Sequence, residues 1–186
     1  MRLIPLAVLS LLWTCARAQT ERPYPTDALP AEIVTLLDTV GVSLYGLDAG
    51  DFRIRENRPN DYLDDQLTLY SKDEKLELRF HLRPARAGDP MAELPHLRAH
   101  TLAMNLGSND EDAVTTVHSF GPEELAVYGA DWARMYTFRP KRSYSERAHA
   151  QFIAVYRKGR GTVYSLLLFD RTPPTLEDRQ LTTRFR

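Results

Sequence analysis

The stretch AHAQFIAVYRKGRGTVYSLLLFD, residues 148–170, decides the fold of this chain. Residues 150–156 and 162–169 are apolar on both alternating faces, which is typical of strands that are covered on both sides. Between them, Lys158-Gly159-Arg160-Gly161 predicts a tight turn. The stretch therefore predicts a central hairpin, and a helix is expected over each face of the sheet that contains it.

Other segments predict the remaining strands of this sheet. Residues 76–82 place an apolar side chain at every second position and a polar or charged one between, which predicts a half-buried strand. Leu67 and Leu69 mark its hairpin partner. Residues 132–139 predict a strand that forms a three-stranded meander with the central hairpin. Residues 52–56 and 113–119 predict two further strands.

Four segments have the apolar spacing or the boundary residues of helices: 30–40, 93–106, 122–129 and a last one that begins near 172–175. The apolar stripes expected to face the core are Leu94, Leu97, Thr101 and Met104 in the second helix, and Leu176, Leu181 and Phe185 in the last. The predicted fold class is α+β, a mostly antiparallel sheet flanked by helices as an α/β/α sandwich. Residues 30–186 are expected to form one domain.

This order of elements resembles the PsbP-like α/β/α sandwich, named for an extrinsic protein of photosystem II. The resemblance rests on the strand Leu76 to Leu82, on the short helix ending in Val127-Tyr128-Gly129-Ala130, and on the hairpin from Phe152 to Phe169. It covers most of residues 40–185, and the helix at 30–40 departs from the pattern. The resemblance implies an accessory or binding protein without a catalytic set of residues, and this implication is an analogy between folds.

The first eighteen residues, MRLIPLAVLSLLWTCARA, have the composition of a secretory signal peptide. Cleavage is expected after Ala18, which predicts an exported protein in the periplasm or outside the cell. Cleavage before Cys15, as in a lipoprotein, is the alternative, although Trp13 and Thr14 are bulkier than that processing favours. Residues 19–29 are expected to form an extended leader. No other stretch approaches the apolar length of a transmembrane helix.

Cleavage after Ala18 would remove the only cysteine, so the mature chain would have no disulfide. It would also remove Arg2 and Arg17, leaving 22 basic against 25 acidic residues and a net charge of −3. This mild acidity argues against bulk nucleic-acid binding. The charge is unevenly distributed, with a net −7 over 89–131 and a net +7 over 132–160. The two segments either steer a charged partner or neutralise each other across the fold.

The sequence predicts no catalytic residues, no metal site and no cofactor. His96 and His100 have the helical spacing of two metal ligands, but no third ligand accompanies them. Residues 109–112 offer hard oxygens without the spacing of a calcium loop, so a polar turn is expected there. Asp64 and Asp65 are adjacent on a predicted strand, where neighbouring side chains point to opposite faces and cannot act on one bond.

The candidate binding residues lie in and beyond the strand at 132–139. Trp132, Arg134 and Tyr136 share one face of this strand with Phe138. If this face is exposed, it would be a contact surface. If it is buried, its rings would belong to the core. Aromatic residues in strands are most often packing residues, so burial is the favoured interpretation. On either interpretation, the basic residues of the loop at 139–147 are expected to reach solvent: Arg139, Lys141, Arg142 and Arg147.

The leading functional hypothesis is an exported, non-enzymatic binding or accessory domain that contacts a macromolecule through the loop at 139–147. Its partner would be another envelope protein or an anionic macromolecule. The alternative is a small-molecule-binding or hydrolytic domain with a pocket between helix and sheet. A flat basic patch with exposed rings would favour the first hypothesis, and a deep cleft with a histidine beside a carboxylate would favour the second.

Overall fold

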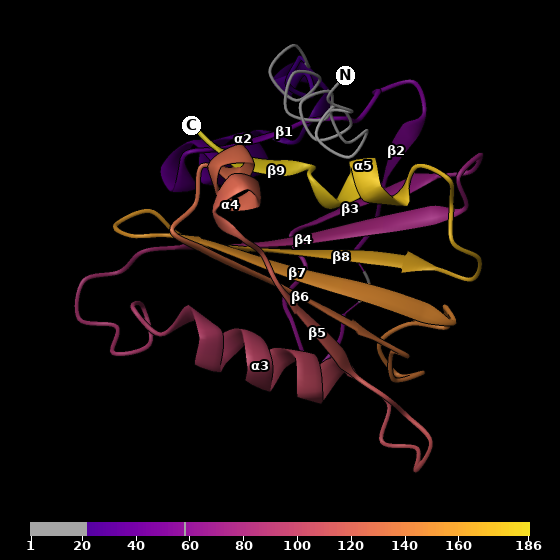
Figure 1. The fold of residues 1–186 in the computed structure, drawn as a ribbon. Helices are drawn as coiled ribbons and strands as arrows, with labels where there is room; N and C mark the ends of the chain where they lie inside the picture. Colours follow the sequence, from indigo (N-terminus) through magenta and orange to yellow (C-terminus); the bar gives the residue numbers. More distant parts are fainter. Residues whose placement is uncertain (1–21, 58) are drawn as a thin grey trace, which may run out of the picture.

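The predicted central hairpin consists of strands β7 (His149–Arg157) and β8 (Gly161–Phe169), in the middle of a larger sheet (Figure 1). The computed structural model describes residues 22–57 and 59–186. Gly161 begins β8 at a φ of 126°, and a Cβ atom there would lie 2.1 Å from the carbonyl oxygen of Arg83. Only glycine therefore fits at this end of the turn.

Seven strands form this sheet in the order β2-β3-β4-β8-β7-β6-β5, and every neighbouring pair is antiparallel. The other five strands are β2 (Phe52–Arg55), β3 (Leu67–Ser71), β4 (Leu76–Pro84), β6 (Trp132–Phe138) and β5 (Thr116–Ser119), and β2 and β5 form the two edges. The predicted strands and the meander of β6, β7 and β8 are confirmed, with β5 shorter than expected. The α+β class with a mostly antiparallel sheet is also confirmed.

Both faces of the sheet are covered (Figure 1). Helix α3 (Pro95–Leu106) lies on one face and packs over β6 and β7. The other face is covered by the remaining helices and by a two-stranded sheet. These elements are η1 (Thr26–Ala28), α2 (Ala31–Val40), α4 (Pro122–Tyr128), α5 (Leu176–Gln180), β1 (Val42–Leu44) and β9 (Thr183–Phe185).

The predicted orientation of α3 is wrong. Its buried side chains are Ala99, Leu102, Ala103 and Leu106, together with Pro95, whereas the stripe expected to face the core points to solvent. Leu97 is 48% exposed and Met104 is 50% exposed. The sheet beneath α3 presents the large rings of Tyr136, Phe152 and Tyr164, so the small side chains of Ala99 and Ala103 let the helix approach closely.

The chain ends differ from expectation in two further ways. The last helix stops at Gln180, and Phe185 belongs instead to β9, where it pairs with Val42 of β1. The segment expected as an extended leader contributes to the core, because Tyr24 and Leu29 are buried. The predicted signal peptide at 1–18 lies outside the described residues. Across the part of the chain that the structure describes, no helix is long and apolar enough to span a bilayer.

The short helix α4 has the predicted boundaries. The Glu124 carboxylate accepts a hydrogen bond from the Gly121 backbone N–H at 2.6 Å, which satisfies a donor at the helix start. Gly129 ends the helix at a φ of 61°, in the left-handed region. A Cβ atom at Gly129 would lie 2.8 Å from the Phe185 carbonyl oxygen, so this glycine also allows β9 to approach.

Candidate functional site

A row of polar side chains crosses one edge of the sheet. The strand register aligns Arg55 of β2 with Thr68 of β3, and Thr68 with Arg79 of β4. The row lies on the same face as α3, because the residues that alternate with Thr68 and Arg79 pack into the core on the other face. Residues 62–65, before β3, and Tyr144, in the loop beyond β6, cover this part of the face.

Arg79 is held by a network of acceptors. Its side chain is only 5% exposed, and its Nε donates to Oε1 of Glu77 at 2.7 Å. Its Nη1 donates to Oδ2 of Asp65 at 3.4 Å and to the backbone carbonyl of Tyr144 at 3.2 Å. The guanidinium carbon lies 4.7 Å from the centre of the Tyr144 ring. These contacts satisfy a charge that would otherwise be costly to bury.

Asp65 completes the network from the segment before β3. Its side chain is 1% exposed, and the Tyr144 hydroxyl donates to its two oxygens at 3.2 and 3.1 Å. Burial raises the pKa of Asp65 to about 6, against the lowering effects of the Arg79 charge and the Tyr144 hydrogen bond. Burial, and then the charge of Asp65, also raise the pKa of Tyr144 well above its ordinary value.

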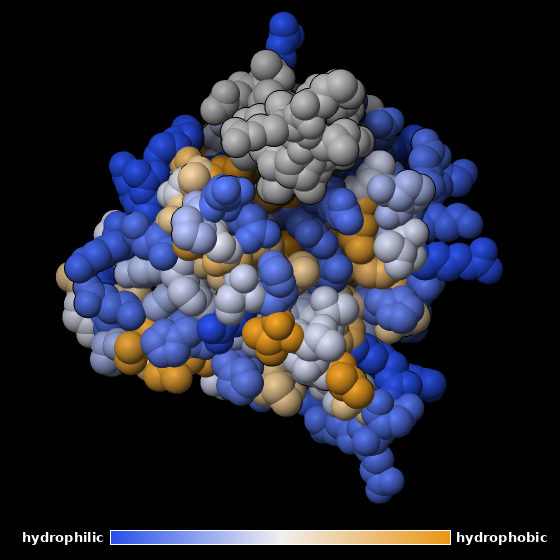
Figure 2. Space-filling view, in the orientation of Figure 1, coloured by the Kyte–Doolittle hydropathy of each residue, from blue (hydrophilic) through white to orange (hydrophobic). Residues whose placement is uncertain are grey.

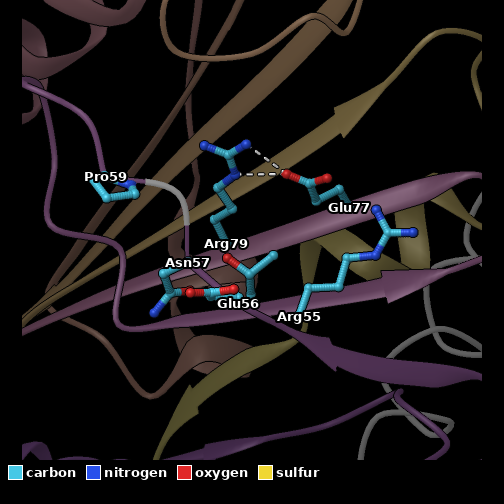
Figure 3. Close-up of a pocket in the computed structure, with 7 residues that line it drawn as sticks. Arg55, Glu56, Asn57, Pro59, Glu77 and Arg79 are labelled. Carbon is cyan, nitrogen blue, oxygen red and sulfur yellow. Dashed lines mark hydrogen bonds and ion pairs between the residues drawn. The ribbon is translucent and has the colours of Figure 1, made fainter.

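A cavity of about 450 Å³ lies beside this network (Figure 3). Arg55, Glu77 and Arg79 reach toward it from the strands, and the segment after β2 forms its other border (Figure 3). The lining residues are Arg55, Glu56, Asn57, Pro59, Thr68, Glu77 and Arg79. None of these described lining residues is a histidine, a lysine or a cysteine, and together they offer charged and hydrogen-bonding groups.

The basic loop is partly neutralised from within the molecule. Arg139 forms ion pairs with Asp110 at 2.9 Å and with Asp112 at 2.7 Å. These pairs support the interpretation that the acidic and basic segments of the sequence meet across the fold. Arg147 is paired with Asp170 at 2.6 Å.

The other two bases of the loop make no ion pair in the described part of the chain. The Nζ of Lys141 lies 5.3 Å from the centre of the Tyr62 ring, at a half-buried position. Arg142 is exposed. Of the four basic residues that the sequence proposes for binding, Arg142 is therefore the most available to a partner.

The aromatic face of β6 belongs to the core, as the burial interpretation expects. Tyr136 and Phe138 are buried beneath α3, so Tyr136 is wrong as a surface contact residue. Trp132 is half-buried at the margin of the same cluster. The guanidinium of Arg134 lies 5.6 Å from the centre of the Trp132 ring. On this face of the strand, Trp132 and Arg134 are partly exposed, whereas Tyr136 and Phe138 are buried.

The other candidates show no ligand geometry. His96 and His100 are both exposed on α3, and the described residues contain no group of three or more side chains suited to hold a metal ion. Asp110 and Asp112 direct their carboxylates to Arg139.

The sequence missed the roles of Asp65 and Arg79. Asp64 is exposed and Asp65 is buried, so the two carboxylates do point apart as expected. Arg79 was expected on a solvent-facing side of its strand, yet it is 4% exposed. Apolar Tyr62 and Leu63 between the polar residues of the covering segment are the signal that this segment packs onto the sheet.

No protein-family model matches the chain, and no curated protein sequence is significantly similar to it. The function must therefore be argued from the surfaces and cavities themselves.

Proposed function

We propose that this protein is an exported, non-enzymatic binding domain that docks a protein partner through the outward face of α3 and the adjoining loop at 139–147. Export rests on the signal-peptide pattern at 1–18, and the accessory role is what the resemblance to PsbP-like proteins suggests. The observation that carries the proposal is the exposed apolar row on α3.

This apolar row consists of Leu94, Leu97 and Met104, which are 37%, 48% and 50% exposed. Large apolar side chains repeated along one helix face, in addition to a buried face, mark a contact surface more often than chance exposure does. Figure 2 shows apolar residues reaching the surface over α3 and β5, among hydrophilic neighbours. Val114, which precedes β5, and Val117, which lies in β5, are also exposed.

The basic loop is continuous with this helix face. Lys141 donates its backbone N–H to the carbonyl of Leu106, the last residue of α3, at 2.8 Å. Ser108 donates to the carbonyl of Arg139 at 2.7 Å. The loop therefore begins where α3 ends, and Arg142 lies close to the C-terminal end of the apolar row.

Charge selects the kind of partner. Helix α3 contains Arg98 and two histidines and has no acidic residue, and the loop at 139–147 has four bases and one acid. An apolar row beside positive charge complements a protein segment that combines apolar with acidic side chains. A second copy of this chain would bring like charges together at the same surface, which disfavours self-association through it.

Site-specific crosslinking tests the proposal. A photoreactive amino acid at position 97 or 104 should yield one shared adduct with a second protein in the cell of origin. The same probe at Ile54, an exposed apolar residue on β2 at the opposite edge of the sheet, is the matched control and should not yield it.

The purified partner should then bind at least tenfold more weakly to the double variant Leu97→Asp, Met104→Asp and to Arg142→Glu. The controls Ile54→Asp and Arg53→Glu should leave its affinity unchanged. Identical adducts at positions 97 and 54, or equal affinities of all the variants, would contradict the proposed surface. An adduct with a second copy of the chain would contradict the acidic partner.

A further inference from the structure

The cavity beside Arg79 has the size of a small-molecule site and is independent of the α3 surface. Its volume of about 450 Å³ lies within the range of ligand clefts, which is roughly 300 to 1,000 Å³. Regular strands support it on one side, and Figure 3 shows the labelled side chains around it. The charges of these side chains indicate which ligand the cavity would accept.

One border of the cavity offers a positive charge without an acidic partner among the described residues. The guanidinium of Arg55 lies 3.5 Å from the centre of the Tyr70 ring, a stacking contact that holds it in place. No carboxylate in the described part of the chain forms an ion pair with Arg55. A positioned guanidinium with free N–H donors is suited to bind a carboxylate through two parallel hydrogen bonds.

The cavity also offers two acceptors, one on β4 and one in the segment after β2. Glu77 directs Oε1 to Arg79, while its Oε2 accepts no hydrogen bond from the described residues. The Oδ1 atom of Asn57 is buried and likewise has no hydrogen-bond partner among them. A buried amide oxygen without a donor is costly, so a ligand that donates to it would be favoured.

Arg79 positions Glu77 and leaves the ligand to other residues. Each of its three nitrogens contacts Glu77, Asp65 or the Tyr144 carbonyl. Dashed lines in Figure 3 mark its contacts with Glu77. The network therefore fixes the Glu77 carboxylate and prevents it from turning toward Arg55.

We propose that the cavity binds a small zwitterion of about dipeptide size, with its carboxylate on Arg55 and its ammonium group on Glu77 and Asn57. Arg55 and Glu77 stand on β2 and β4, which are separated by β3, and the strand register offsets them by two residues, so their backbones are about 12 Å apart. An anion would leave Asn57 without a donor and would be repelled by Glu56 and Glu77. A cation would leave Arg55 unpaired.

The test uses L-alanyl-L-alanine and two blocked forms of it as probes. The N-acetylated form lacks the ammonium group, and the C-terminal amide lacks the carboxylate. In a titration followed by nuclear magnetic resonance, the zwitterion should shift the backbone amide resonances of Arg55, Asn57 and Glu77, and the shifts should saturate. Each blocked form should bind at least tenfold more weakly. Equal affinity for the three probes, or no saturable shift with the zwitterion, would overturn the proposal.

Two variants locate the site. Arg55→Met should weaken binding of the zwitterion at least tenfold. Arg53→Met, on the same strand and the same face but outside the lining, is the matched control and should bind like the natural protein. Asn57→Ala provides a second variant and should also weaken binding. Unchanged affinity in both Arg55→Met and Asn57→Ala would overturn the assignment, and neither result depends on the α3 surface.

Discussion

Asp65 and Arg79 place opposite charges in the interior, behind the cavity. Their side chains are 1% and 5% exposed, and water contributes little to their solvation. Removing one partner of such a pair leaves the other charge buried and costs about 3 to 5 kcal/mol in typical cases. Asp65 has a second state, because protonation neutralises it while the Tyr144 hydroxyl stays close. Its contribution to stability therefore depends on pH.

Asp65 should stabilise the fold more at pH 4 than at pH 7. Its pKa is about 6 in the folded protein against 3.8 in the ordinary case, so folding favours the protonated form. Its contribution to the free energy of unfolding is complete below about pH 4 and is lost as the pH rises through 6. The loss amounts to about 2 to 3 kcal/mol. Urea unfolding of the natural protein and of Asp65→Asn at several pH values measures it.

The free energy of unfolding of the natural protein, relative to that of Asp65→Asn, should fall by this amount from pH 4 to pH 7. Asp64→Asn changes the exposed neighbour and serves as the control. If Asp64→Asn showed a pH-dependent difference of the same size, the effect would belong to general acid unfolding and the role of Asp65 would be contradicted.

Helix α3 shows how an element can be predicted while its rotation is not. Residues 95–106 carry apolar side chains on two stripes, and periodicity alone favours either one. The structure selects the stripe with Ala99 and Ala103, because the aromatic rings of the sheet leave room for small side chains. The other stripe contains Leu97 and Met104 and becomes the proposed contact surface.

Leu106→Ala and Leu97→Ala should separate the two faces of α3. Leu106 is fully buried, so its truncation leaves a cavity and should lower the free energy of unfolding by about 2 to 5 kcal/mol. Leu97→Ala makes the same chemical change on the exposed face and should alter it by no more than about 0.5 kcal/mol. Urea unfolding of both variants measures the difference. A larger loss for Leu97→Ala would contradict the observed orientation.

The strands could be predicted from the sequence, whereas the cavity could not. Alternation locates β4 and its partner β3, and the glycine turn locates β7 and β8, because these signals are local. The burial of Arg79 depends on Asp65 and Tyr144, which are distant in sequence and reach it only through tertiary packing. For this reason, the alternating pattern of β4 predicts an exposed Arg79.

The distribution of charge belongs to the whole molecule. Residues 89–131 are acidic and residues 132–160 are basic, and the contacts of Arg139 with Asp110 and Asp112 join the two segments. The pairing is exposed and contributes little to stability. Its effect is to reduce the positive field of the basic loop, so that Arg142 and the apolar row on α3 have a larger part in the proposed docking.

The pairing of β9 with β1 should be required for stability. A chain that ends at Thr182 loses Phe185, which is 8% exposed, and the backbone pairing with β1. The free energy of unfolding should fall by about 3 kcal/mol or more, as for the loss of a buried phenylalanine. Thermal and urea unfolding measure the change.

A chain that ends at Phe185 is the control for this truncation. It loses the Arg186 backbone bond to Gly41, the hydrogen bonds of Arg186 with Arg157 and Leu37, and an exposed ion pair with Asp38. Because these contacts are largely exposed, its stability should change by about 1 kcal/mol, less than on the loss of β9. Equal losses for the two truncated chains would contradict the role of β9.

The β1–β9 pair also determines how late in synthesis the fold can be completed. Its two strands come from opposite ends of the described chain, so this contact cannot form until residue 185 has been synthesised. At ordinary translation speeds, of about 5 to 20 residues per second, β9 follows β1 by about 7 to 30 s. We expect the helix-covered face around β1 to stay incomplete during that interval. The nascent chain would then remain accessible to a chaperone until β9 has been made.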